Sequence, residues 1–205
     1  NFIVDQYSRL QAGLSHINEE QYIQRFISLD KRGYVWKDKV YDQLIEEFGI
    51  KEYTANFLLE DYIAHFRNHC IPFPNVVPML NKLRNLGYSI GIISNGMTDF
   101  QLHNIRSLQI ETYFQTILIS EKEGLRKPDP LIFQKALQQL EVSANECVFV
   151  GDHPENDVIA SSKVGMTSVW KRDDYWSGVE ADYIIDDLLE IFHILESIEI
   201  KRKII

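Results

Sequence analysis

The segment CVFVGDHPEND, residues 147–157, decides how the rest of the chain is interpreted. Its apolar run, Cys147 to Val150, has the length and composition of a buried β-strand. Asp152 emerges directly after this run and Gly151, and Asp157 follows in the next segment. A carboxylate in such a position is costly unless it meets a cation or hydrogen-bond donors. Two carboxylates this close suit Mg²⁺, so we expect Asp152 and Asp157 to bind metal. The simpler alternative is that Asp152 caps the following helix.

Further apolar runs surround this strand at intervals along the chain. Patterns of amphipathic helices separate them, and that alternation indicates an α/β fold with a parallel sheet covered by helices on both faces. In such a sheet a ligand sits beyond the carboxyl ends of the strands. The other predicted strands are residues 88–93, 116–119, 167–170 and 183–185.

The first 70 residues have a different texture, because their apolar residues recur only at helical spacing. Asn18 is placed to cap a helix that begins at Glu19, and Gly49 to end another. The change comes at Ile71-Pro72-Phe73-Pro74. We therefore predict a helical domain over residues 1–70 and an α/β domain over residues 71–205.

Ser94-Asn95-Gly96 follows the predicted strand 88–93 and precedes a helix. A strand-to-helix turn of this kind presents backbone N–H groups and a helix N-terminus, which favour an anion. Ser94 adds a hydroxyl, Asn95 an amide, and Gly96 lets the backbone approach closely. An ordinary turn, with Gln101 completing a capping box, is the alternative.

Lys127 precedes Pro128, which biases its backbone toward an extended conformation. Pro130 suits the first turn of the next helix. The lysine is thus expected on a stiff loop at the sheet edge, where its ammonium can neutralise a phosphate or a carboxylate. A solvated loop lysine is the alternative.

The overall composition limits the classes of partner. A formal charge of -9 argues against nucleic acid, whose phosphates select basic surfaces. We expect no membrane span, and the distant Cys70 and Cys147 indicate reduced thiols and a cytoplasmic protein. His65 and His69 are spaced like a metal pair on a helix, but we expect a structural role because no further ligands accompany them.

Together these motifs resemble the haloacid dehalogenase-like (HAD) hydrolase superfamily. The resemblance covers residues 71–205, with the motifs carried by Ile92 to Gly96, Lys127 to Pro130 and Val150 to Asp157. It implies a Rossmann-like core and a helical bundle cap over residues 1–70, as in the branch with phosphoglycolate phosphatases and haloacid dehalogenases. It also implies cap insertion after the first strand.

In this family an aspartate on the first strand attacks phosphorus and forms an aspartyl-phosphate, and a second aspartate acts as acid and base. The resemblance implies that Ser94, Asn95 and Gly96 bind the phosphoryl group. Lys127 would balance its charge as a catalytic residue beside Ser94. Asp152 would ligate Mg²⁺, and Asp157 would ligate it or support its shell.

The first motif of the family is missing. Phe2 to Asp5 mimics its beginning, but Tyr7 stands where the acid/base aspartate belongs. We expect an additional N-terminal strand of about twenty residues, by analogy with the family layout. The 205 residues alone are then expected to lack phosphatase activity, and turnover by them would refute this.

Four functions remain open on this fold. The first is a Mg²⁺-dependent phosphatase for a small phosphorylated metabolite. A 2-haloacid dehalogenase needs no metal and would survive EDTA; Asp152 and Asp157 speak against it. The others are a phosphosugar mutase and a catalytically inactive protein. Substrate choice is expected in the segment Asp30 to Asp38, through Arg32, Trp36 and Lys37, unless this segment is a solvated helix connection.

Overall fold

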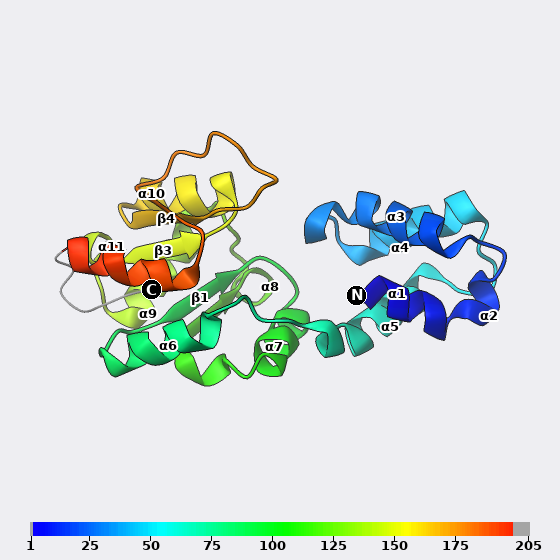
Figure 1. Cartoon of the computed structure of the whole chain (residues 1–205), viewed down its shortest axis with the longest axis horizontal. Helices are drawn as coiled ribbons and strands as arrows, with labels where there is room; N and C mark the ends of the chain where they lie inside the picture. The colour runs from blue at the N-terminus through cyan, green and yellow to red at the C-terminus, as the bar shows by residue number, and fades with distance from the viewer. Residues whose placement is uncertain (1, 199–205) are drawn as a thin grey trace. The chain divides into compact units, whose positions relative to one another are not determined.

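The computed structural model describes residues 2–198. The chain divides into two compact units, Asn1–Cys70 and Ile71–Ile205, which we call the helical unit and the core unit. In Figure 1 the helical unit runs from blue to cyan, and the core unit holds every labelled strand. Within residues 2–198, no helix combines the length and the apolar character needed to cross a membrane.

The helical unit is built from helices whose ends match the sequence signals. Asn18 caps α3 by accepting a hydrogen bond from the Gln21 N–H, and Gly49 ends α4 with a φ of 62°. Glycine tolerates this left-handed conformation without a steric penalty. The elements are α1 (Phe2–Arg9), α2 (Gln11–Leu14), α3 (Glu19–Asp30), η1 (Lys31–Gly33), α4 (Lys37–Phe48), α5 (Ala55–His65) and η2 (Phe66–His69).

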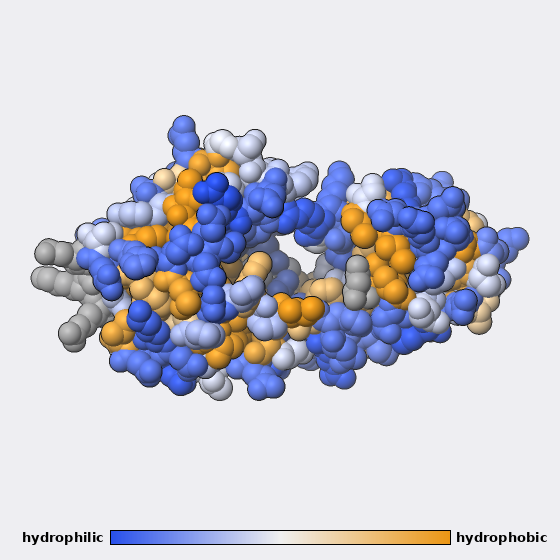
Figure 2. Space-filling model, viewed as in Figure 1, coloured by the Kyte–Doolittle hydropathy of each residue, from blue (hydrophilic) through white to orange (hydrophobic). Residues whose placement is uncertain are grey.

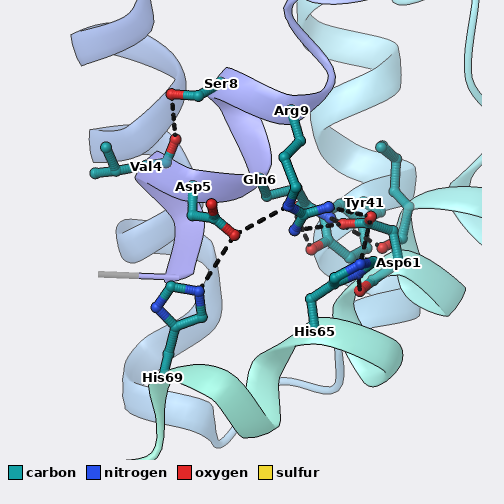
Figure 3. A network of polar contacts seen from close by, with 10 residues as sticks. Val4, Asp5, Gln6, Ser8, Arg9, Tyr41, Asp61, His65 and His69 are labelled. Atoms are coloured by element: carbon teal, nitrogen blue, oxygen red, sulfur yellow. Dashed lines mark hydrogen bonds and ion pairs between the residues drawn. The ribbon is translucent and has the colours of Figure 1, made fainter.

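A buried polar network ties α1 to α4 and α5 (Figure 3). Gln6 is fully buried, and its Nε2 donates to the Leu58 carbonyl at 3.1 Å and to Asp61 Oδ2 at 2.9 Å. The Tyr41 hydroxyl donates to Gln6 Oε1 at 2.7 Å. Arg9 forms an ion pair with the same Asp61. Because both ends of the Gln6 amide are satisfied, this buried polar group specifies how the three helices pack.

The two histidines of interest contact different carboxylates in this network (Figure 3). His65 Nδ1 lies 3.2 Å from Asp61 Oδ1, and His69 Nε2 lies 3.2 Å from Asp5 Oδ2. Arg9, as the largest cause, lowers the pKa of Asp5, and His69 adds to this effect. Both histidines therefore act in structural contacts within the helical unit.

The core unit alternates helices with short strands, as the sequence predicted. On the face that Figure 2 shows, hydrophilic residues predominate, with hydrophobic patches between them. The helices are α6 (Val76–Asn85), α7 (Thr98–Ser107), η3 (Glu111–Tyr113), α8 (Ser120–Glu123), α9 (Pro130–Leu140), η4 (Ala144–Glu146), η5 (Pro154–Ile159), α10 (Ala160–Val164), η6 (Leu188–Glu190) and α11 (Ile191–Ser197).

All strand pairs are parallel, but the strands form two sheets. One sheet pairs β1 (Gly91–Ser94) with β2 (Thr116–Ile119). The other has the order β3 (Val148–Gly151), β4 (Thr167–Lys171), β5 (Tyr183–Ile185). No strand among residues 2–198 pairs with the second edge of β1 or with that of β3.

The first strand is shorter than predicted, because residues 88–90 place their hydrogen bonds elsewhere. The Tyr88 N–H donates to the carbonyl of Leu83 at the end of α6. The Ile90 N–H donates to the side chain of Gln115. These residues connect the helix to the sheet and leave the pairing with β2 to Gly91–Ser94.

Two hydrophobic layers join both sheets. Ile92 of β1 and Val148 of β3 pack in one layer, which includes residues of α6, α7 and α11. Ile93 and Phe149, one position along each strand, pack in the other layer with α9 and α10. Successive strand residues face opposite sides of a sheet, so β1 and β3 share a common central layer with helices on both faces. This confirms the predicted α/β class.

Candidate functional site

The Ser94-Asn95-Gly96 turn leaves the carboxyl end of β1 and is attached to α8. The Gly96 N–H donates to Ser120 Oγ at 2.9 Å, and Ser120 Oγ approaches the Gly96 carbonyl at 3.3 Å. The Glu121 carboxylate accepts a hydrogen bond from the Thr98 N–H at 2.7 Å. Glu121 of a neighbouring helix therefore caps α7 at Thr98, a task that the sequence assigned to Gln101.

The Gly96 backbone has a φ of 152°, and a Cβ there would lie 2.8 Å from the Gln101 side chain. Both facts favour glycine. The sequence analysis expected Gly96 to bind the phosphoryl group through close approach of its backbone. In the structure the Gly96 N–H donates to Ser120 Oγ instead. Ser120 was missed by the sequence analysis, although its hydroxyl directly follows β2, one position beyond the residue that pairs with Ser94 at the end of β1.

Lys127 connects the segment that follows β1 to the segment that follows β3, by its hydrogen bonds and its ion pair. Asn95 makes two hydrogen bonds to the Lys127 backbone. The Lys127 ammonium forms an ion pair with Asp157 Oδ1 at 2.5 Å and lies 5.6 Å from the centre of the Phe149 ring. The side chains of Lys127 and Asp157 are only 13% and 5% exposed. The structure thus brings together three predicted residues from three separate segments.

Asp157 reaches this position because the chain leaves β3 without a side chain at Gly151. A Cβ at Gly151 would lie 2.3 Å from the Asp157 Cβ, which no real side chain tolerates. The second Asp157 oxygen accepts the His153 N–H at 3.0 Å. Asp157 therefore folds back over the end of β3 with both oxygens engaged.

The cap of the following helix is His153. Its Nδ1 accepts hydrogen bonds from the Glu155 and Asn156 N–H groups at 3.1 and 3.2 Å. The first turn, Pro154–Ile159, is a π-helix. Because His153 caps this helix, the alternative prediction that Asp152 is the helix cap is wrong.

Asp152 lies at the surface with its carboxylate partly surrounded by protein. Burial, as the largest cause, and then repulsion from Asp157 raise the pKa of Asp152. Lys127 opposes this shift. The Asp152 carbonyl accepts a hydrogen bond from Trp170 Nε1 at 3.0 Å, which fixes the backbone at this point. A raised carboxylate pKa indicates an anion that a bound cation would stabilise.

Asp152 and Asp157 fit Mg²⁺ by their chemistry and position. Mg²⁺ prefers oxygen ligands and commonly takes only one or two carboxylates from the protein. Within residues 2–198, no group of three or more histidine, cysteine or acidic residues is placed to hold a metal ion. Because Asp157 is already paired with Lys127, Asp152 is the better placed of the two as a direct ligand.

Within the segment Asp30 to Asp38, the structure contradicts the role that the sequence analysis expected for Lys37. Lys37 is 4% exposed, forms an ion pair with Asp30 and lies 5.3 Å from the Tyr62 ring centre. It is a buried structural residue, so its role as a substrate contact is wrong. Arg32 is exposed, with a φ of 60°, on a turn that Asp30 holds by accepting the Gly33 N–H at 2.7 Å.

A family model described as haloacid dehalogenase-like hydrolase matches residues 3–171. A glyceraldehyde 3-phosphate phosphatase from Pyrococcus furiosus is 30% identical over 187 residues, which cover 78% of this chain and 77% of that protein. The same-named protein of Pyrococcus abyssi is 41% identical over 97 residues, which cover 47% of this chain but only 41% of that protein.

Solved structures agree with this assignment. The crystal structure of a HAD phosphatase from Thermococcus onnurineus has a TM-score of 0.67 and 28% identity, covering 95% of this chain and 88% of that one. A 2-haloacid dehalogenase from Pseudomonas syringae has a TM-score of 0.63 and 25% identity, with the same coverage. The chain therefore belongs to the haloacid dehalogenase-like hydrolase family.

Proposed function

We propose that the protein is a Mg²⁺-dependent phosphatase that hydrolyses a small phosphorylated metabolite through an aspartyl-phosphate. The observation that supports this proposal is the linkage of the three motifs. Asn95, beside Ser94, binds the Lys127 backbone, and the Lys127 ammonium pairs with Asp157. Both Lys127 and Asp157 lie near enough to Asp152 to shift the pKa of its carboxyl. A hydroxyl donor, an ammonium and a carboxylate are the groups that phosphoryl transfer requires, since positioning and charge stabilisation dominate that reaction.

We further propose that the nucleophilic aspartate lies on an additional strand between β1 and β3. The support is that no strand within residues 2–198 pairs with the second edge of β1 or of β3, while residues of both strands pack in the same two hydrophobic layers. Unpaired edges inside a covered sheet leave N–H and C=O groups that a parallel strand would satisfy. Such a strand would end beside Ser94 and Asp152.

The proposed reaction has two steps. A carboxylate oxygen of the nucleophile bonds to phosphorus while the bond to the leaving oxygen breaks, and the second aspartate protonates that oxygen. Water then attacks phosphorus after giving a proton to this same aspartate, which releases phosphate and restores the nucleophile. Ser94 would donate a hydrogen bond to a phosphoryl oxygen, and the Lys127 ammonium would balance the negative charge.

The metal proposed for this site would neutralise charge on the phosphoryl oxygens. Asp152 would ligate it directly. Asp157 would act mainly through Lys127 and the His153 backbone, whose contacts occupy both its oxygens. The sequence alone left open whether Asp157 ligates the metal or supports its shell, and these contacts favour the supporting role.

The names of the relatives support a proposal for the substrate class. We propose a small phosphate ester as substrate and glyceraldehyde 3-phosphate as the first compound to test, because the relatives named above carry that activity. We propose a cytoplasmic protein with no nucleic-acid partner. Its support is the formal charge of -9 over the whole sequence and the thiols of Cys70 and Cys147, which form no disulfide with each other in the part of the chain that the structure describes.

The test is phosphate release by the full-length protein from a panel of phosphate esters, with Mg²⁺ and with EDTA. The proposal predicts turnover that EDTA abolishes. The similarity to a 2-haloacid dehalogenase supplies the second candidate, so the panel includes 2-haloacids. Chloride release that persists in EDTA, without phosphate release, would favour dehalogenation over our proposal.

A further inference from the structure

We infer that Asn95 is a positioning residue for Lys127, and that its side chain serves the lysine backbone instead of the substrate. The inference rests on the proposed function, in which Lys127 balances the charge of the phosphoryl group. It changes the role that the family resemblance implied for Asn95, which was direct phosphoryl binding.

The contact consists of two hydrogen bonds in opposite directions. Asn95 Nδ2 donates to the Lys127 carbonyl at 2.8 Å, and the Lys127 N–H donates to Asn95 Oδ1 at 2.9 Å. Two bonds of this kind fix both the position and the rotation of a peptide unit. Each bond contributes about 0.5–1.5 kcal/mol net, as an ordinary hydrogen bond does. The two bonds therefore matter more for the position of the Lys127 backbone than for the stability of the fold.

Lys127 needs this support because it lies in a connection without regular structure. The connection runs from the end of α8 at Glu123 to Asp129, the N-cap of α9. Within this connection the Asp129 N–H donates to the Arg126 carbonyl at 2.8 Å. A lysine side chain is long and flexible, so its ammonium is placed accurately only if its backbone is held.

The lysine is consequently held at both ends. Asn95, from the turn after β1, holds its backbone, and Asp157, from the segment after β3, holds its ammonium at 2.5 Å. The two attachments come from the two separate sheets. A displaced backbone would move the ammonium away from Asp157 and from the proposed position of the phosphoryl group.

The Asn95 side chain is occupied by hydrogen bonds to Lys127, whereas the side chain of its neighbour Ser94 takes no part in this contact. The Asn95 carbonyl oxygen and one N–H of its amide are occupied by Lys127. No hydrogen bond joins the Ser94 hydroxyl to another residue in the described part of the chain, residues 2–198. Ser94 is therefore the side chain of this turn that remains available to a phosphoryl oxygen.

The turn has an independent attachment, which makes Asn95 testable. Gly96 and Ser120 bind each other through a second pair of contacts, at 2.9 and 3.3 Å. Replacement of Asn95 by alanine leaves that pair intact. The turn should keep its path while Lys127 loses its backbone anchor.

The first test is a double-mutant cycle in the full-length protein with Asn95→Ala, Lys127→Ala and both together. Asn95→Ala should lower kcat by roughly 10- to 100-fold, as misplacement of a catalytic group does. In the Lys127→Ala background it should change kcat by less than about twofold, because coupled residues are not additive. Asn85→Ala, an exposed asparagine at the end of α6, is the control.

Equal fold losses from Asn95→Ala in both backgrounds would overturn the inference, because Asn95 would then act without Lys127. A second measurement is independent of catalysis. Amide hydrogen exchange at Lys127 should be slow in the wild type and clearly faster in Asn95→Ala, with Asn85→Ala unchanged. Unchanged exchange at Lys127 would also overturn it. If wild type releases no phosphate at all, the proposed function fails, while the exchange result still decides what Asn95 does.

Discussion

At the scale of the residue, the site depends on one close approach. Gly151 ends β3, and the Asp157 side chain lies where a side chain at Gly151 would have been. That approach lets Asp157 reach Lys127 in a pair that is almost fully buried. Buried charges persist only when they are paired and hydrogen-bonded, and Asp157 meets both conditions.

We therefore predict that Gly151→Ala disrupts the site. Its Cβ would push Asp157 away from Lys127, so we expect a loss of stability of about 1–3 kcal/mol, as in overpacked cores, together with a large fall in kcat. Urea unfolding and phosphate release measure the two effects. Gly178→Ala is the control for a glycine replacement without a clash: no atom lies within 4 Å of its Cβ, and its φ of 67° adds only a backbone penalty. Full activity in Gly151→Ala would contradict this account of Asp157.

Lys37 supplies a second residue-scale prediction. Lys37→Met removes the ammonium but keeps the length of the side chain, and leaves the Asp30 carboxylate without its ion pair. We expect a loss of about 3 kcal/mol, the low end for a broken buried pair, because Asp30 remains 17% exposed. Thermal and urea unfolding measure it, with the exposed Lys39→Met as control. An altered substrate preference with unchanged stability would restore Lys37 as a substrate contact.

At the scale of the element, side chains couple neighbouring helices through charges at the surface. Arg25 of α3 donates to both oxygens of Glu47 in α4, at 2.6 and 2.5 Å. This contact, followed by a hydrogen bond from Gln43, lowers the pKa of Glu47 to about 2. The pair lies on the outside of the helical unit, so its effect depends on pH and salt.

The sign of the pH dependence follows from that shift. A carboxylate whose pKa is lower in the folded state stabilises it above the unfolded pKa, and that stability is lost as the pH falls. For Glu47 the loss spans pH 4.5 to about 2. Glu47→Gln should be less stable than wild type at pH 6, and the difference should shrink across that window. Unfolding at several pH values measures it, with Glu46→Gln as control; a constant difference would contradict the assignment.

The elements also show what the sequence could predict. The apolar runs gave the strands around Ile93, Leu118 and Phe149 because buried parallel strands are nearly continuous in hydrophobicity. The order of the motifs at strand ends predicted which side chains are brought together. The partner of Asp157 was not predictable, because it depends on a π-helical turn and on space above Gly151. The sequence analysis took Lys37 for a substrate contact because the sequence gives no sign that its side chain is buried and paired with Asp30.

At the scale of the whole molecule, the two units are joined by Ile71-Pro72-Phe73-Pro74. Ile71 and Phe73 are 86% and 66% exposed, although both are large apolar residues. Each unit has its own buried core, so we propose that residues 1–70 and 71–205 are separate domains. Exposed connections of this kind are the preferred sites of proteolysis.

Limited digestion with the broad-specificity protease proteinase K should therefore cut first in the exposed connection around residues 70–75, at a bond that no proline follows. We expect two fragments that resist further digestion, with masses that divide the chain at residues 70–74. Mass spectrometry of the early products reads this directly. First cuts within α3 or α9 would argue against two independently packed domains.

The central claim is that the ends of β1 and β3 form the phosphoryl-transfer site. The most direct measurement is the kcat for phosphate release by the full-length protein with Lys127→Ala, beside Lys122→Ala, an exposed lysine of α8. Ser94→Ala accompanies them because it leaves no buried charge, and melting temperatures check the fold. The account predicts that Lys127→Ala and Ser94→Ala each lower kcat by about 100-fold or more, while Lys122→Ala matches wild type. Near-wild-type turnover by folded Lys127→Ala and Ser94→Ala would contradict it.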